Sequence, residues 1–261
     1  MSPAVKSGIK LSIFGIVAFI VFLVATLPAN VAYSYWKKMR GANVPVVLSD
    51  VEGSIWSGRV GKAFVKGQPF QSVAWDANGY TLLLGILELN FEFKVPDGYA
   101  RGVVGHSFFG GTYLNDVEAW LPLSQIKNLF NIDALRPAGD LDIQLSTVKI
   151  DKNTIVSAKG DLAWHSAELT LLKKLNLGDL QVTLEPSEEG IKGVLADQGG
   201  PLIADGILQL NRDNSFQFTG EFAARGNQPD LANALRTMGR PDREGKVKVN
   251  QSGNLSALGV L

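Results

Sequence analysis

The residues that could do acid–base or metal chemistry are few in this chain, and their spacing matches no catalytic motif. His106 and His165 are the two histidines; they are far apart and lack the H-E-x-x-H spacing of a zinc site. A Ser-His-Asp triad needs no short spacing, so the sequence alone leaves it open, but no Gly-x-Ser-x-Gly turn presents a nucleophile. We expect each histidine to be a polar residue at a strand end.

Other reactive groups are also missing or are better explained as surface residues. The chain has no cysteine, which excludes disulfides, thiol catalysis and cysteine metal sites. No G-x-x-x-x-G-K-[ST] phosphate loop occurs, although glycine is abundant. The acidic pair Glu188-Glu189 stands between Pro186 and Gly190 and is typical of a solvated turn rather than of paired glycosidase carboxylates. We therefore predict no enzyme activity, no cofactor and no metal.

One apolar run near the start predicts what holds the rest of the chain in place. Residues 9–27 contain thirteen Leu, Ile, Val or Phe residues and one charge, Lys10. Nineteen residues of helix are roughly 28 Å long, close to a hydrocarbon core of about 30 Å. Thirteen such side chains favour insertion by about 4–8 kcal/mol. A cleaved signal peptide is the alternative, but its apolar core is shorter and ends in a small-x-small site that is absent here.

These features predict three segments, which are a tail at 1–8, a transmembrane anchor at 9–30 and a β-rich domain at 41–261. The charge count before and after the anchor is nearly tied, so the positive-inside rule does not settle the orientation. The formal net charge is zero, which gives no electrostatic footprint for nucleic acid. Aromatic and basic residues after the anchor are predicted to lie at the membrane interface: Tyr33, Tyr35, Trp36, Lys37, Lys38 and Arg40.

Beyond the anchor, alternating apolar residues predict strands. The clearest case is residues 87–95, where Leu, Phe and Val alternate with Glu, Asn and Lys before a Pro-Asp-Gly turn. Six further segments begin with Gly-x-apolar, and we interpret them as antiparallel strands that each start after a glycine turn. These segments begin at Gly139, Gly160, Gly178, Gly206, Gly220 and Gly245.

Helices are predicted to be too few to cover such a sheet. Residues 122–130 and 229–238 have helical spacing, and residues 166–175 are ambiguous between helix and strand. The expected fold is therefore mostly β: one N-terminal transmembrane helix, then a large antiparallel sheet that is curled or sandwich-like, with two or three short helices. A boundary between two β-lobes is possible near residues 131–139, although we slightly prefer one domain.

The sharpest local motif is Gly53-Ser-Ile-Trp-Ser-Gly58, in which two glycines bracket a tryptophan. We expect a short strand in which Ile55 and Trp56 point to opposite faces. Glycine permits close backbone approach, and the indole ring can cover the resulting gap. Packing is the favoured interpretation, and a docking surface that also includes Trp75 is the functional alternative.

With these elements in order, the chain resembles the type II secretion system protein N family. The resemblance rests on the short start, the anchor ending in Leu-Pro-Ala29, the Gly53–Gly58 motif, Val-Ala-Trp75, and a late helix followed by Gly245-Lys-Val-Lys-Val. It implies an inner-membrane protein of a Gram-negative bacterium with its bulk in the periplasm. It also implies a non-enzymatic accessory role in exporting folded proteins, with the inner-membrane connector protein and the periplasmic part of the secretin as partners.

Two other functions stay open. Glycine-led strands behind an anchor also resemble AsmA-like envelope proteins, whose sheets curl into an apolar groove for lipid tails. An open apolar interior would favour that lipid ligand, whereas a filled core would favour scaffolding. An anchored hydrolase is the third alternative.

Overall fold

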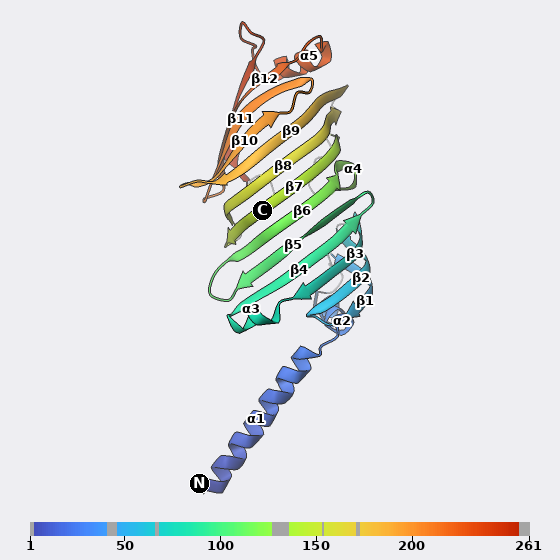
Figure 1. Cartoon of the computed structure of the whole chain (residues 1–261), viewed down its shortest axis with the longest axis vertical. Coiled ribbons are helices and arrows are strands. Elements are labelled where there is room, and N and C mark those ends of the chain that lie inside the picture. Colours follow the sequence, from blue (N-terminus) through green and yellow to red (C-terminus); the bar gives the residue numbers. More distant parts are fainter. Residues whose placement is uncertain are drawn as a thin grey trace.

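The protein consists of a long N-terminal helix that leads into a single large sheet, as seen in a computed structural model (Figure 1). The structure describes residues 3–40, 46–65, 68–126, 136–152, 154–170 and 173–255. Within these ranges, residues 3–12 and residue 126 are described by their backbone alone.

Two helices precede the sheet, α1 (Pro3–Ala25) and α2 (Ala29–Arg40). The predicted anchor extended to residue 30, but α1 ends at Ala25. Pro28 lacks a backbone N–H, and the residue before a proline is driven out of the helical region, so the helix stops there. Within the part of the chain with described side chains, no helix is both long and apolar enough to cross a membrane.

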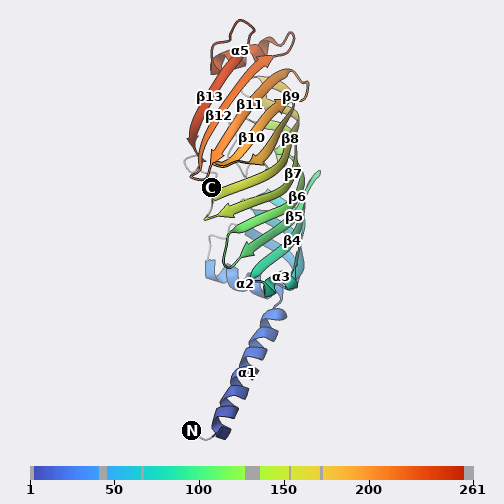
Figure 2. The same cartoon turned by 60° about the vertical axis from the view of Figure 1, so that its left-hand side comes forward.

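The sheet contains thirteen antiparallel strands, and each strand pairs with the strand that precedes and the strand that follows it in the sequence. The mostly β, antiparallel fold is thus confirmed, and the sheet is one open, twisted sheet rather than a sandwich (Figure 2). The strands are β1 (Val46–Gly53), β2 (Ser57–Val65), β3 (Gln68–Ala77), β4 (Ile86–Val95), β5 (Gly98–Ser107), β6 (Thr112–Pro122), β7 (Pro137–Asp151), β8 (Thr154–Thr170), β9 (Lys174–Pro186), β10 (Gly190–Asp197), β11 (Leu202–Asn211), β12 (Ser215–Ala224) and β13 (Val247–Asn254).

Among the described residues, three short helices lie in the connections between strands: α3 (Gly79–Leu83), α4 (Leu123–Ile126) and α5 (Pro229–Met238). The predicted helix at 229–238 is confirmed, and residues 123–126 of the segment 122–130 are helical. In the ambiguous segment 166–175, residues 166–170 end β8 and residues 174–175 begin β9, while residues 171–172 lie outside the described residues. The strands on either side of the possible lobe boundary, β6 and β7, pair with each other, so one sheet continues across it. Residues 127–135 lie outside the described residues.

The glycine-led segments are strands, but five of the six glycines do not start them. Gly160 lies in the middle of β8, and Gly206 faces Gly220 across β11 and β12. The ring of Phe218 fills the space above this pair, 2.9 Å from where a Cβ on Gly206 would lie. Glycine here makes room for a neighbouring ring or for a bulge, which is why the prediction of strand starts was wrong. Only Gly245 comes before its strand, β13.

The core is divided into small clusters along one face of the sheet. At the far end, Leu231 and Leu235 of α5 pack on Ala167, Leu175 and Val247. The accessible surface is 16606 Å², against about 11000 Å² for a compact protein of this mass. The molecule is therefore extended, and much of its apolar surface is only partly buried.

Candidate functional site

The Gly53–Gly58 motif is the turn between β1 and β2 rather than a strand. Gly53 has φ +87°, and a Cβ there would collide with the carbonyl oxygen of Ser57. A Cβ on Gly58 would lie 2.5 Å from the ring of Trp75. Both positions require glycine, because the turn is tight on one side and covered by an indole on the other. The expected strand was wrong because Gly53 takes the left-handed conformation and turns the chain.

This turn is fastened to the end of α1. Trp56 donates its indole N–H to the carbonyl oxygen of Val24 at 3.0 Å, and the backbone N–H of Ile55 donates to Leu27 O at 3.0 Å. Pro28 forms an isolated bridge with Ser54. The last carbonyls of a helix have no partner within it, so the turn supplies donors that the helix end needs. We call residues 24–28 and 53–58 the joint.

Trp75 supports the joint from the next strand. Its indole N–H donates to the carbonyl oxygen of Ile55 at 3.2 Å, and its ring covers Gly58. The structure thus brings together all five residues of the predicted motif, Gly53, Ile55, Trp56, Gly58 and Trp75. Their hydrogen bonds join them to one another, to the end of α1 and to Leu27, and Trp75 also packs against the apolar cluster around Val60 and Phe70.

The residues predicted for a membrane interface lie on α2 and separate into two groups. The Tyr33 hydroxyl accepts from Leu48 N at 3.0 Å and donates to Val46 O at 3.3 Å, so it covers the outer edge of β1. Trp36 stacks on Tyr33 with ring centroids 6.0 Å apart. Tyr35 is 68% exposed. The basic residues Lys37, Lys38 and Arg40 are exposed in the last turn of α2.

An apolar cleft beside the joint was not foreseen from the sequence. It lies between the last turns of α1 and α3 and is lined by Ile20, Val21, Val24, Trp56 and Leu82, among others. Residues 78–85 carry no charge, and Asn78 caps α3 by accepting from Tyr80 N at 3.1 Å. An uncharged, capped turn next to an aromatic motif was the signal in the sequence that could have indicated it.

The histidines have structural partners. His106 Nδ1 lies 2.9 Å from Thr112 Oγ1, and His165 Nδ1 lies 3.3 Å from Asp179 Oδ2. Asp179 has a lowered pKa, chiefly because it accepts from the backbone N–H of Ser166. No group of three or more metal-binding side chains occurs among the described residues. The exposed pair Glu188-Glu189 lies in the turn between β9 and β10, as predicted.

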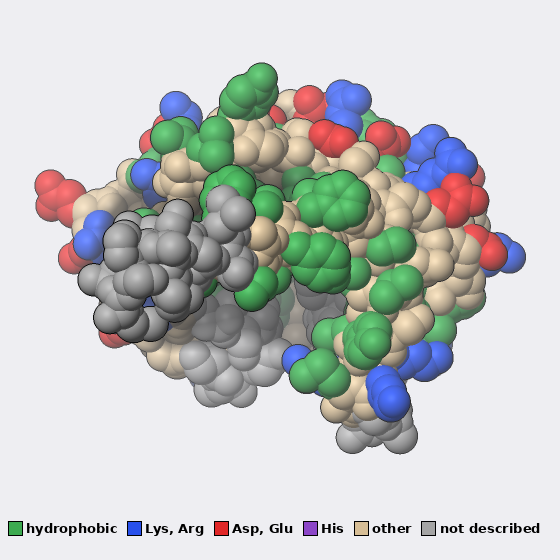
Figure 3. Space-filling model, turned by 90° about the horizontal axis from the view of Figure 1, so that it is seen from below, with side chains coloured by type: hydrophobic (Ala, Val, Ile, Leu, Met, Phe, Trp, Pro, Cys, Tyr) green, Lys and Arg blue, Asp and Glu red, His purple; other side chains and the backbone are tan. Residues whose placement is uncertain are grey.

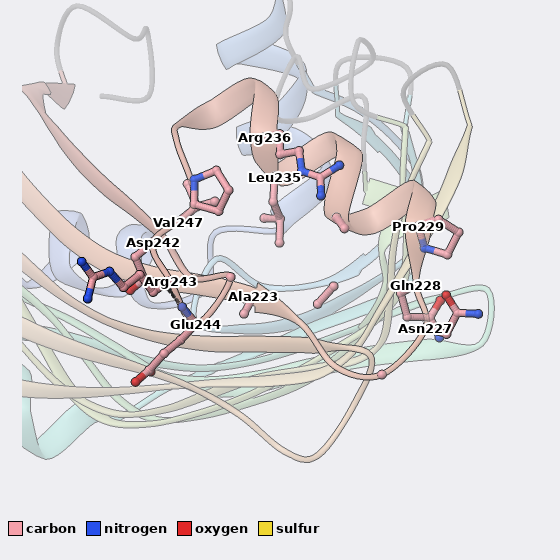
Figure 4. A pocket seen from close by; sticks show the side chains of 15 residues that line it. Ala223, Asn227, Gln228, Pro229, Leu235, Arg236, Asp242, Arg243, Glu244 and Val247 are labelled. Carbon is pink, nitrogen blue, oxygen red and sulfur yellow. Dashed lines mark hydrogen bonds between the residues drawn. The ribbon is translucent and has the colours of Figure 1, made fainter.

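A second hollow lies at the opposite end of the sheet, between α5, β12 and the loop before β13 (Figure 4). Charges of both signs line it, including Arg236, Arg243 and Glu244. Asp242 accepts from the backbone N–H groups of Glu244 at 2.8 Å and Lys246 at 2.9 Å, so its carboxylate holds the loop. These contacts account for the loop geometry.

Comparisons with known proteins agree with the resemblance seen in the sequence. The family model described as "Type II secretion system (T2SS), protein N" matches residues 45–250. A curated relative, "Type II secretion system protein N" of Aeromonas hydrophila, is 24% identical over 259 residues, covering 96% of this chain and 100% of the relative. No solved structure matches. The chain therefore belongs to the type II secretion system protein N family.

Proposed function

We propose that this protein is a non-enzymatic, single-pass inner-membrane subunit of the type II secretion system, whose periplasmic sheet scaffolds neighbouring subunits. Family membership supports the general role of a secretion-system component. The anchor, the topology and the partners are our inference from the residues described above.

The surface of α1 supports the anchor. Six consecutive residues from Phe19 to Val24 are exposed, so apolar side chains occupy every side of the helix. A helix that is apolar all round is stable in a protein core or in lipid, and no described element surrounds α1. Exposed basic residues at Lys37, Lys38 and Arg40 suit anionic headgroups at the membrane surface.

The joint is the observation that carries the proposal. Two hydrogen bonds of 3.0 Å, a bridge and the supporting indole of Trp75 connect α1 to the sheet within a few residues of the helix end. A flexible tether would leave the sheet free to rotate at the membrane. A fixed joint sets its orientation, so the sheet meets other anchored subunits at one angle and weak contacts suffice.

The sheet edges differ in their availability to such partners. At β1 the Tyr33 hydroxyl bonds to the outward backbone groups of Val46 and Leu48, so part of that edge is covered. At β13 the exposed polar residues include Lys248, Asn250 and Gln251, and after its first residue, where Val247 bridges Pro241, no described strand pairs with its outer side. We therefore propose β13 as the edge to which a strand of the connector protein or the secretin is added.

In-cell crosslinking tests this proposal. A photoreactive residue replaces Gln251 on the edge strand in the full-length protein, and the matched control carries it at Lys192, exposed on the interior strand β10. We expect connector or secretin peptides to be crosslinked from position 251 and not from 192. Equal yields of these peptides from both positions, or none from either, would contradict edge scaffolding.

A second candidate function, binding of lipid tails in an apolar groove, is favoured by one row of residues. Ile143, Leu162 and Val182 face one another across β7, β8 and β9, and each is only partly buried. None of the three belongs to the core clusters. A photoreactive residue at Leu162 that crosslinks phospholipid, with no protein partner at Gln251, would favour this alternative over scaffolding.

A further inference from the structure

The turns along one side of the sheet, at the ends of the strands, differ in charge according to their distance from α1. In an antiparallel meander every second turn lies on the same side, and here that side is the one where α1 joins. The first three, the near turns, are residues 54–56, 78–85 and 108–111, and none carries a charged residue. The next three, the far turns, carry exposed charged residues: Lys152, Glu188, Glu189, Arg212 and Asp213.

The second and third near turns expose large apolar side chains, which we call the near patch. These side chains are exposed far beyond what a turn requires: Tyr80 84%, Leu83 84%, Leu84 75%, Phe108 62% and Phe109 95%. At about 200 Å² for a fully exposed aromatic side chain, Tyr80, Phe108 and Phe109 alone present roughly 480 Å², to which the two leucines add. The largest apolar patch on a typical monomer is about 300–600 Å² and is often a binding site.

The near patch is held in a defined shape. Phe108 N donates to Gly85 O at 3.0 Å and so links the two turns, and a Cβ on Gly85 would lie 3.3 Å from the ring of Phe109. Below α3, Glu88 accepts from Asn78 Nδ2 at 3.1 Å and from the Tyr113 hydroxyl at 2.6 Å. Hydrogen bonds between the two turns and around Glu88 therefore fix the backbone that carries the exposed apolar side chains.

The position of the patch relative to α1 indicates what covers it. The apolar cleft lies between α3 and the last turns of α1, and Leu82, Ile20 and Val24 all line it. Figure 3 views this end of the molecule, where hydrophobic side chains gather. At about 1.5 Å per residue, Ile20 lies roughly 7 Å below the helix end at Ala25. Interfacial elements bury their apolar face about 5–10 Å into the boundary between headgroups and acyl chains. With the helix end placed at the membrane surface, α3 and its patch residues lie at the depth of that boundary.

We propose that the near patch inserts into the membrane interface beside α1 and forms a second contact of the sheet with the same bilayer. This proposal rests on the proposed anchor. The joint orients the sheet relative to α1, and the patch adds a second contact with the bilayer, so the sheet is held at a set tilt to the membrane. The absence of charge in the near turns and its return in the far turns follow from which turns reach lipid.

Depth-dependent fluorescence quenching tests the proposal, and the cysteine-free chain allows single labels. An environment-sensitive fluorophore is attached at Phe109→Cys, with Glu189→Cys in a far turn as the matched control and Val17→Cys as the anchor control. The full-length protein is placed in vesicles of phosphatidylethanolamine and phosphatidylglycerol that contain nitroxide-labelled lipid. We expect at least twofold quenching at 109 by a shallow nitroxide, none at 189, and quenching at 17 by a deep nitroxide.

Each other outcome is decisive. Quenching at 17 with no difference between 109 and 189 would overturn the near patch and leave the anchor intact. No quenching at 17 would instead overturn the proposed anchor. A blue-shifted but unquenched label at 109 would mean that protein covers the patch, such as a second copy of the chain, and would also overturn the proposal.

Discussion

The near and far turns make the same kind of connection between antiparallel strands, yet the near turns carry no charge and the far turns carry exposed charged residues. Polar side chains close both kinds of turn: Asp213 accepts from Ser215 N at 2.9 Å in a far turn, and Asn78 accepts from Tyr80 N at 3.1 Å in a near turn. The difference is in what they expose, because that far turn exposes Arg212 and Asp213, whereas the near turns at 78–85 and 108–111 expose Leu83, Phe108 and Phe109. Turn geometry alone does not require this difference. The composition of a turn therefore follows the surroundings that it faces.

The largest expected effect is at the glycine that starts the joint. Gly53→Ala places a Cβ against the Ser57 carbonyl at φ +87°, so we expect the free energy of unfolding to fall by about 2–4 kcal/mol. Gly199→Ala is the matched control, because Gly199 has φ +92° but no atom within 4 Å of a Cβ. Thermal unfolding in detergent micelles measures both, and equal losses would contradict the importance of close approach at the joint.

A smaller effect is expected when one hydrogen bond of the joint is removed. Trp56→Phe keeps an aromatic ring but loses the indole bond to Val24 O, which costs about 0.5–1.5 kcal/mol. We expect the sheet to move more widely relative to α1, with the protein still folded. Spin-label distance distributions between α1 and β10 measure this, and an unchanged width would show that the bond does not fix the orientation.

Trp56→Ala separates packing from docking at the same residue. Since Trp56 contacts α1 and lines the apolar cleft, the packing interpretation predicts a lower amount of protein in the membrane. Reduced secretion at an unchanged protein level would instead support docking by Trp56. Immunoblotting of membranes, together with an assay of exported protein, distinguishes the two.

The near patch is expected to matter little for folding. Phe109→Ser should change the free energy of unfolding in detergent by less than about 0.5 kcal/mol, because the side chain is 95% exposed. The same variant should widen the range of tilt angles of the sheet relative to the membrane in vesicles. Glu189→Ser, in a far turn, should change neither quantity. A large loss of stability for Phe109→Ser in detergent would mean that the ring packs within the protein.

The smallest effect is a contrast in pH dependence. The hydrogen bond to Glu88 raises the pKa of Tyr113 to about 12, so its contribution to stability is complete below about pH 10 and is lost as pH rises through about 12. Hydrogen bonds from Ser215 lower the pKa of Asp213, so its contribution is present above about pH 4 and is lost as pH falls.

Alkali should therefore loosen the support of the near patch, and acid should loosen the far turn. Tyrosinate absorbance in the wild-type protein and in Tyr113→Phe measures the first. Proteolysis at low pH in the wild-type protein and in Asp213→Asn measures the second. An ordinary tyrosine titration near pH 10 at Tyr113 would contradict the bond to Glu88.

Alternation and helix signals were sufficient to predict much of the fold. Residues 87–95 became β4 and residues 229–238 became α5, because each has one face against apolar neighbours. Gly160 was misread because sequence does not distinguish a glycine that starts a strand from one that faces a partner in its middle. That choice depends on which strand lies alongside, which is a tertiary property.

The joint was partly predictable. The Gly53–Gly58 motif was recognised as a site of close approach, but its partner, the carbonyl oxygen of Val24, is a backbone group that no residue type reveals. The near patch was not predicted, because the adjacent residues Phe108 and Phe109 match neither the alternation of a strand nor helical spacing. The absence of charge from the three near turns becomes visible only after the strands are placed in order.

The most direct test of a sheet held at a fixed orientation by the joint and the near patch is one distance distribution. Spin labels at Val17→Cys on α1 and Lys192→Cys on β10 report it in the full-length protein in vesicles, since both positions are exposed. The account predicts a single narrow distribution that broadens when Trp56→Phe and Phe109→Ser are combined. A broad distribution in the otherwise unaltered protein would contradict it.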